Sequence, residues 1–155
     1  MAEKYKTAEE VKKRYEGKIS VLGEDYLIKV RDPDRDPRLG ETNDGYCDST
    51  TGLIVISDGV REAKHPEAVG DFDRYREKVL RHEIVHAFIA ESGNQDAEWH
   101  TEDMVNWLAY MAPRLHAAFT AANCAGGCCG ESAQELATKN LREACCAPPY
   151  KRMNV

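Results

Sequence analysis

Residues 73–92 read DRYREKVLRHEIVHAFIAES and predict the longest helix of the first part of the chain. It contains neither proline nor glycine, and its apolar residues recur every three or four positions, the period of a helix with one buried face. These residues are Val79, Leu80, Ile84, Val85, Phe88 and Ile89. Asp71 or Asp73 can cap the start of the helix, and Gly93 follows it where a left-handed terminal residue is expected. The sequence therefore predicts a long helix that is largely buried.

The helix carries the motif His82-Glu83-Ile84-Val85-His86. Residues four apart lie on one face of a helix, so the imidazoles of His82 and His86 can bind the same ion, and neutral imidazole is a preferred zinc ligand. Glu83 lies beside such an ion, where it can take a proton from a zinc-activated water. So short a motif also arises by chance on an exposed helix with two ordinary histidines. The apolar residues around it favour the metal site, because buried polar side chains need partners.

A catalytic zinc usually has three protein ligands and leaves one position for water. Glu102 is the first candidate for the third ligand, and Glu98 and His100 stay open as alternatives in the same segment. The third histidine of metzincins is absent, because Ile89 and Ser92 stand where that pattern has a glycine and a histidine.

A second helix is expected over residues 96–112, which Pro113 would stop or kink, and a third over residues 114–122. Glu102 then lies near the start of the second helix. Asn106, one turn further along, could orient that carboxylate or a ligand imidazole.

The motif followed by a glutamate on the next helix resembles the gluzincin arrangement. The run EDMVNWLA that begins at Glu102 is similar to the third-ligand helix of ImmA/IrrE-type metallopeptidases, and together with RHEIVHAFIAESG it resembles small metallopeptidase-like proteins of phages and prophages. The resemblance covers about residues 45–112 and departs from the family pattern at Val105, where alanine is usual. It implies a zincin-like α+β domain in which a small sheet of hairpins packs against both helices. It also implies Zn²⁺ bound by His82, His86 and Glu102.

The N-terminal half predicts a short helix and two β-hairpins. Thr7 and Glu10 have capping-box spacing before a helix over residues 8–16. Residues 31–43, rich in Asp, Pro and Arg, are expected to form a loop. The expected strands are residues 19–22, 26–30, 46–48 and 53–57. The hairpin before the long helix is the candidate to receive an extended peptide by strand addition.

The composition limits the class of protein. A chain of 155 residues fits a single domain over residues 1–155, with a core at about 18–122 and a cysteine-rich tail at about 123–155. The net charge of −6 argues against a nucleic-acid partner, and no apolar run is long enough to cross a membrane. The N-terminus has no export signal, so a cytoplasmic location with mostly reduced cysteines is expected. The oligomeric state stays open.

Most of the cysteines lie in the tail, at Cys124, Cys128, Cys129, Cys145 and Cys146. Three interpretations stay open for them: thiols without a special role, a second metal site, and redox or disulfide chemistry. Adjacent pairs are poor geometry for one tetrahedral site. Cys47 stands alone and is expected to pack in the fold.

Two functions follow from these features. The first is a zinc-dependent metallopeptidase that hydrolyses peptide bonds of a protein or peptide substrate through a zinc-activated water, with Glu83 as general base. The alternative is a non-catalytic binding or regulatory protein of phage or prophage origin that keeps the zincin fold. Glu83 favours the enzyme, because a purely structural zinc site needs no carboxylate beside its water. The candidates for oxyanion stabilisation are His116, Tyr110 and Tyr46.

Overall fold

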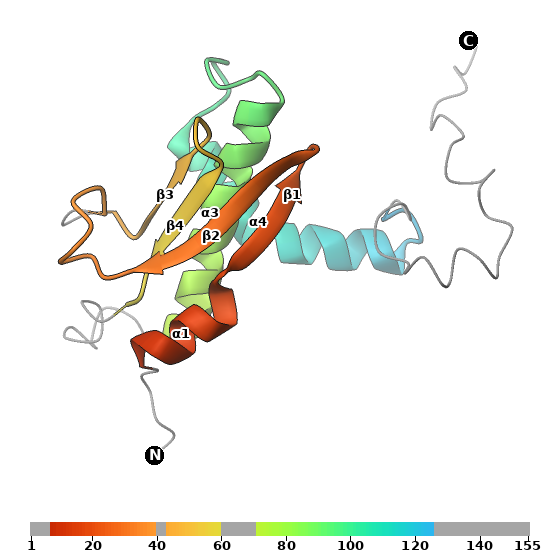
Figure 1. The fold of residues 1–155 in the computed structure, drawn as a ribbon. Helices are drawn as coiled ribbons and strands as arrows, with labels where there is room; N and C mark the ends of the chain where they lie inside the picture. Colours follow the sequence, from red (N-terminus) through yellow and green to blue (C-terminus); the bar gives the residue numbers. More distant parts are fainter. Residues whose placement is uncertain (1–6, 40–42, 60–70, 126–155) are drawn as a thin grey trace, which may run out of the picture. The chain divides into compact units, whose positions relative to one another are not determined.

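The computed structural model describes residues 7–39, 43–59 and 71–125, and the chain divides into two compact units, Met1–Ala112 and Pro113–Val155. The first unit contains a four-stranded mixed sheet and helices, which confirms the expected α+β class (Figure 1). The elements of the chain are α1 (Ala8–Tyr15), β1 (Gly17–Val21), β2 (Glu24–Arg31), β3 (Gly45–Asp48), β4 (Leu53–Ser57), α3 (Phe72–Glu91) and α4 (Glu102–Ala121).

The sheet consists of the two predicted hairpins, placed side by side. β1 pairs antiparallel with β2, and β3 pairs antiparallel with β4. The hairpins meet through a parallel pairing of β2 with β4, in which Ile28 lies opposite Ile54. The strand order is therefore β1-β2-β4-β3, and β1 and β3 are the two edge strands.

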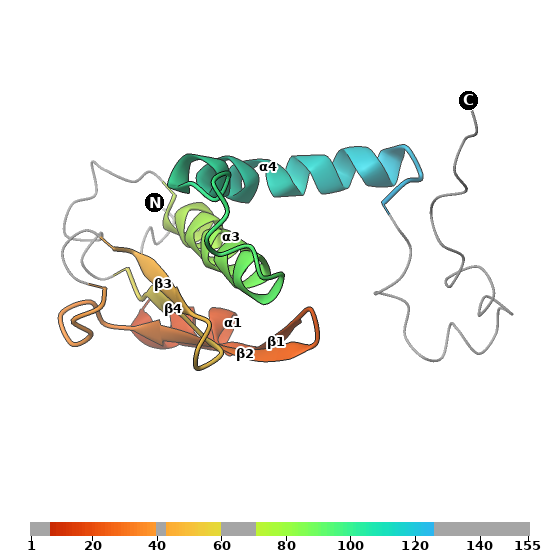
Figure 2. The ribbon, with the colours of Figure 1, turned by 90° about the horizontal axis from the view of Figure 1, so that it is seen from above.

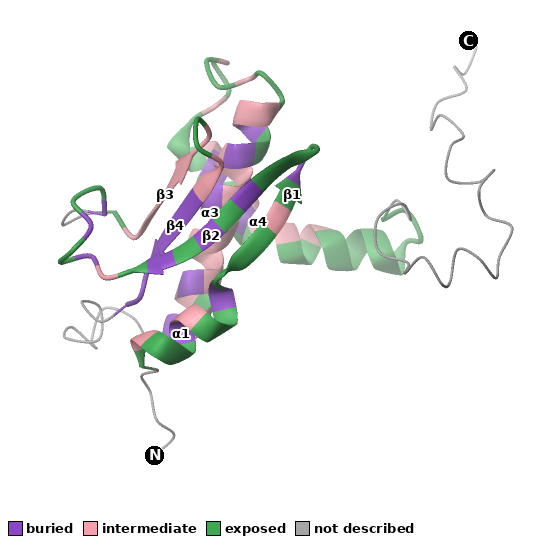
Figure 3. Ribbon diagram, viewed as in Figure 1, coloured by how far each residue is buried: buried purple, intermediate pink, exposed green. Residues whose placement is uncertain are grey.

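The core lies between the sheet and α3. Buried and exposed residues alternate along β2 (Figure 3). Tyr26 and Ile28, two positions apart and both buried, therefore lie on the same face of the sheet. They pack with Ile54 of β4 and Ala87 of α3, and Leu80 lies against this cluster from the helix. Each large apolar side chain buried in this way stabilises the fold by roughly 1.5–3 kcal/mol. The long helix is thereby held against the sheet along the turns that carry the motif.

Both predicted helix starts in the first part of the chain are confirmed. At α1, the Glu10 amide donates to Thr7 Oγ1 at 3.3 Å and the Thr7 amide donates to Glu10 Oε2 at 2.8 Å, which completes the capping box. At α3, Asp71 is the cap and accepts from the Arg74 amide at 3.0 Å. Gly93 follows the helix with a φ of +72°, the left-handed conformation that glycine adopts without strain.

The second long helix differs from the prediction at both ends. It begins at Glu102 and not near residue 96, because Thr101 caps it by accepting from the Met104 amide at 3.3 Å. It also continues through Pro113 to Ala121, so the expected stop at Pro113 and the separate helix over residues 114–122 were wrong. Proline removes the amide that would bond to the Ala109 carbonyl, and Arg81 Nε of α3 donates to that carbonyl instead, at 2.8 Å.

The first turns of α4, up to Ala112, lie against α3 on its side away from the sheet (Figure 2). In the second unit, only residues 113–125 are described, and they contain the remainder of α4 and an exposed, free Cys124. The interpretations given for Cys128, Cys129, Cys145 and Cys146 fall outside the described residues. Within the described ranges, no helix combines the length and the apolar character that a membrane crossing requires.

Candidate metal centre

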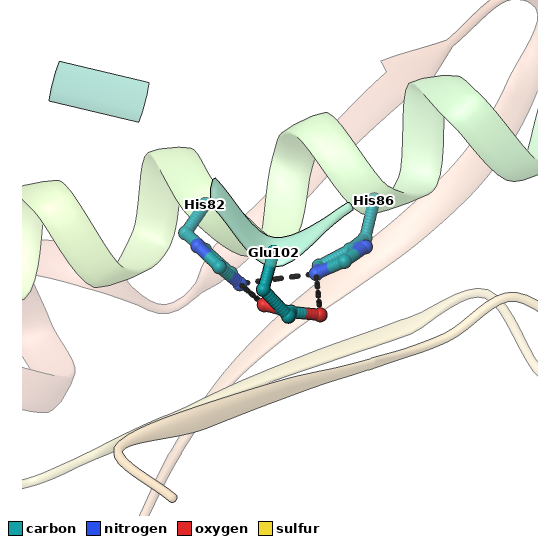
Figure 4. Close-up of side chains that lie close together, drawn as sticks. All are labelled: His82, His86 and Glu102. Carbon is teal, nitrogen blue, oxygen red and sulfur yellow. Dashed lines mark hydrogen bonds and ion pairs between the residues drawn. The ribbon is translucent and has the colours of Figure 1, made fainter. Parts of the chain in front are cut away.

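α3 and the start of α4 bring together three side chains that can share one ion. His82 and His86 lie one turn apart on α3, and Glu102, the first residue of α4, faces both (Figure 4). The Nε2 atoms of the two histidines are 3.0 Å apart. Glu102 Oε2 lies 3.2 Å from Nε2 of His82, and Glu102 Oε1 lies 3.5 Å from Nε2 of His86. The structure therefore brings Glu102 next to the two histidines of the motif, as the sequence predicted.

The three side chains are close enough together to hold one metal ion, because one ligand atom from each lies within 4.8 Å of the others. Zinc bonds of roughly 2.0–2.2 Å to nitrogen and oxygen place neighbouring tetrahedral ligand atoms about 3.3–3.6 Å apart. The two histidine nitrogens, at 3.0 Å, lie within a few tenths of an ångström of that range, and Glu102 approaches each histidine with a different carboxylate oxygen. The Glu102 side chain is 72% exposed, so the cluster is open to solvent and leaves space for a fourth, non-protein ligand.

The surroundings keep both histidines in the form that binds metals. Burial lowers the pKa of His82 and of His86, and the neighbouring imidazoles lower the pKa of His86 further. The carboxylate of Glu102 raises both pKa values and opposes this effect. Burial is the largest contribution, so both imidazoles are neutral near pH 7, as a metal ligand must be.

His100 supports the cluster from behind and is not one of its three converging groups. Its Nε2 lies 3.0 Å from Nδ1 of His86, and its own Nδ1 lies 2.8 Å from the Gln95 carbonyl. The carbonyl can only accept, so His100 carries its proton on Nδ1 and accepts at Nε2 from the Nδ1–H of His86. This chain leaves Nε2 of His86 unprotonated and directed at the cluster.

The structure also shows where Asn106 and Glu98 lie relative to the cluster. The Asn106 side chain hydrogen-bonds to His82, which is the orienting role expected for it. Glu98 is exposed and lies outside the group whose ligand atoms converge. Of the candidates for the third ligand, only Glu102 reaches both histidines in the described structure.

Glu83 lies beside the cluster in a different environment. Its side chain is only 6% exposed, and it lines the same cavity as the two histidines. Burial raises the pKa of Glu83 to about 8, and the nearby charge of Glu102 contributes to the increase. A carboxyl group with a pKa near neutrality can both accept and donate a proton at physiological pH.

The cavity next to the cluster has a volume of about 340 Å³, and one of its walls is the edge strand β3. Gly45, at the start of β3, allows a close approach of strand and helix. A Cβ at this position would lie 2.8 Å from Val79 Cγ1 and 3.0 Å from Glu83 Oε1. The absence of a side chain at Gly45 therefore leaves Glu83 next to the backbone of an edge strand.

The three candidates for oxyanion stabilisation lie in different places. Tyr46 lines the cavity, but its hydroxyl donates to Asp36 at 2.9 Å and accepts from Arg31 at 3.1 Å. Tyr110 is 54% exposed, and His116 is exposed on the second unit. The hydroxyl of Tyr46 is therefore directed at Asp36 and Arg31 and away from an oxyanion role at the cluster.

Cys47 packs against the main core cluster, as expected. Burial raises the pKa of its thiol to about 12, so the thiol stays protonated near pH 7. A protonated, half-buried thiol is a poor nucleophile and a poor metal ligand, so Cys47 does not compete with the histidine cluster.

Several residues near the cluster were not singled out from the sequence. Gly45 has no local signal, because its role depends on the helix packed against it. Lys78 and Tyr75 precede His82 by four and seven residues, so helical spacing alone could have placed them on the same face.

Comparison with protein-family models, with curated proteins and with solved structures finds no match to this chain.

Proposed function

We propose that the protein is a zinc-dependent metallopeptidase of zincin type, related to the ImmA/IrrE-type enzymes that its motifs resemble. The proposal rests on one observation: a cluster of possible metal ligands and a separate, buried glutamate line the same cavity. Three converging side chains, His82, His86 and Glu102, could hold one metal ion. A fourth, Glu83, is buried beside them and takes no part in the cluster.

When bound, zinc supplies a Lewis acid that polarises a carbonyl group and lowers the pKa of a water molecule towards 7. His82, His86 and Glu102 hold the ion, and His100 and Asn106 orient the two imidazoles. Glu83 accepts the proton of the attacking water and transfers it to the leaving amine. The buried environment of Glu83 raises its affinity for that proton, which suits a group that must carry it between two steps.

The edge strand supports a peptide as the substrate. Among the described strands β3 pairs only with β4, and its residues Gly45, Tyr46 and Cys47 line the cavity. An extended peptide can add to such an edge through backbone hydrogen bonds, which bind the chain without requiring a particular sequence. Its scissile bond would then lie between the strand and the cluster.

The test has a binding measurement and an activity measurement. We expect close to one zinc per chain in the wild-type protein, and His82→Ala with His86→Ala should remove it. Glu102→Ala should reduce the zinc affinity by at least about 10²-fold, whereas Glu98→Ala, a matched change on the exposed turn, should leave it unchanged. Elemental analysis and titration against a competing chelator measure both effects.

Activity is tested with the Glu83→Gln variant, which keeps the size of the side chain but cannot accept the proton. It should bind zinc like the wild type and lose at least roughly 10²-fold in the rate of peptide cleavage. Cleavage at an unchanged rate would contradict the role of Glu83. A wild-type protein that binds zinc and peptides, but cleaves none of them, would favour the non-catalytic binding protein.

A further inference from the structure

A second cavity adjoins the first. It has a volume of about 310 Å³ and shares Asn43, Gly45, His82 and Glu83 with the first cavity. The two cavities therefore adjoin at His82, one of the candidate metal ligands. A peptide that follows β3 past this point has a side chain on either side of it, and the second cavity is where one of them can enter.

The wall of this second cavity carries a lysine. Lys78 lies one helical turn before His82 on α3, lines the cavity, and is close enough for its charge to lower the pKa of His82. Its side chain is half-buried, and no described carboxylate forms an ion pair with it. An ammonium group that lines a cavity and forms no ion pair with a described carboxylate favours an anionic ligand.

Two carboxyl groups also line this cavity, namely Asp44 and Glu83, and Glu83 is buried. Asp44 accepts a short hydrogen bond from the hydroxyl of Tyr75. Glu102 faces the two histidines and would be neutralised by the ion there. Among the described residues that line the cavity, Lys78 is therefore the cation that a ligand can reach.

We propose that this cavity is a specificity pocket in which Lys78 binds an acidic side chain, Asp or Glu, next to the scissile bond. The inference rests on the proposed function, because the pocket is defined relative to the metal cluster. It names the substrate class for that site, namely peptides with an acidic residue beside the cleaved bond. Asn106 lines the same cavity and offers an amide donor to the same carboxylate, and Asn43, whose amide nitrogen donates one hydrogen to the Arg38 carbonyl, has a second N–H.

The experiment uses two dipeptide hydroxamates that differ only in carrying a Glu or a Gln side chain next to the metal-binding group. Calorimetric titration of the zinc-loaded protein measures their affinities without requiring turnover. The Glu compound should bind about tenfold more tightly than the Gln compound, since one charge pair in a partly buried pocket distinguishes them. Lys78→Met should abolish this difference, and Lys78→Arg should retain most of it.

Lys13→Met, which removes an exposed lysine of α1 far from both cavities in the sequence, is the matched control and should behave like the wild type. Equal affinities of the two compounds in the wild type, a preference that survives in Lys78→Met, or failure of both compounds to bind would each overturn the pocket assignment. The proposed function is judged separately, by cleavage of a defined peptide mixture. If the protein prefers the Glu compound but cleaves no peptide, the pocket assignment is supported and the proposed peptidase activity is contradicted.

Discussion

Replacing Glu83 by glutamine in the metal-free protein should increase the stability of the fold in a pH-dependent way. The pKa of Glu83 is raised from 4.5 to about 8 in the folded state, chiefly by burial. The folded protein therefore keeps a proton that the unfolded chain releases above about pH 4.5. The stability that depends on this proton is fully present below pH 4.5 and is lost as the pH rises towards 8.

The size of the effect follows from the linkage between proton binding and unfolding. Each pH unit between the two pKa values lowers the free energy of unfolding by about 1.4 kcal/mol. At pH 7 the free energy of unfolding of the wild type is therefore roughly 3 kcal/mol lower than below pH 4.5. This is an upper value, because the surroundings of Glu83 relax around the charge. A neutral glutamine of the same size avoids this loss.

The assay is urea unfolding of both proteins with a chelator present, at pH 5, 6, 7 and 8. The two should be nearly equal in stability at pH 5, and the Glu83→Gln variant should be the more stable by roughly 3 kcal/mol at pH 7. Glu98→Gln, which changes an exposed glutamate, should show no such divergence. The reasoning is refuted if the Glu83→Gln variant gains nothing over the wild type between pH 5 and pH 7. Bound zinc should reduce the gain, because a dication favours the ionised carboxylate.

Two further predictions concern supporting residues. His100→Ala should lower the zinc affinity by roughly 10–100-fold, since it removes the acceptor for the Nδ1–H of His86 at 3.0 Å, and His100→Gln should recover part of it; an unchanged affinity in chelator titrations would show that the chain of hydrogen bonds is dispensable. Arg81→Met should lower the free energy of unfolding by about 1–3 kcal/mol, because the Ala109 carbonyl loses its donor. The loss should be smaller in a Pro113→Ala background, where the helix supplies its own amide, and equal losses in both backgrounds would argue against this explanation.

Much of the local structure follows from short-range signals that the sequence carries openly. The capping box at Thr7, the cap at Asp71 and the glycine at position 93 each act within one helical turn, so the bounds of α1 and α3 were predicted to within about two residues. The i,i+4 spacing of His82 and His86 likewise needs only a helix to bring both imidazoles to one side. The two hairpins were readable from their turn residues and apolar runs.

The second long helix shows why other features were not readable. The apolar spacing after residue 96 suited a helix, but Thr101 competes for its start, and the chain forms turns until that cap. Proline normally ends a helix because it leaves a carbonyl unsatisfied. Here the donor for that carbonyl is Arg81, 28 residues earlier in the chain, so a pattern search near Pro113 has no access to it.

Helical spacing was enough to place His82, Glu83 and His86 on one helix with both imidazoles on the same side, because these relations act within a single turn. Only the tertiary structure distinguished Glu102 from Glu98 and His100, since all three follow the same helix within a few residues of one another. The choice depends on where the turns after Gly93 return the chain to α3, and on which side chain then faces the cluster. The parallel pairing of β2 with β4 is equally non-local, and it is this pairing that leaves β3 as an edge strand beside Glu83.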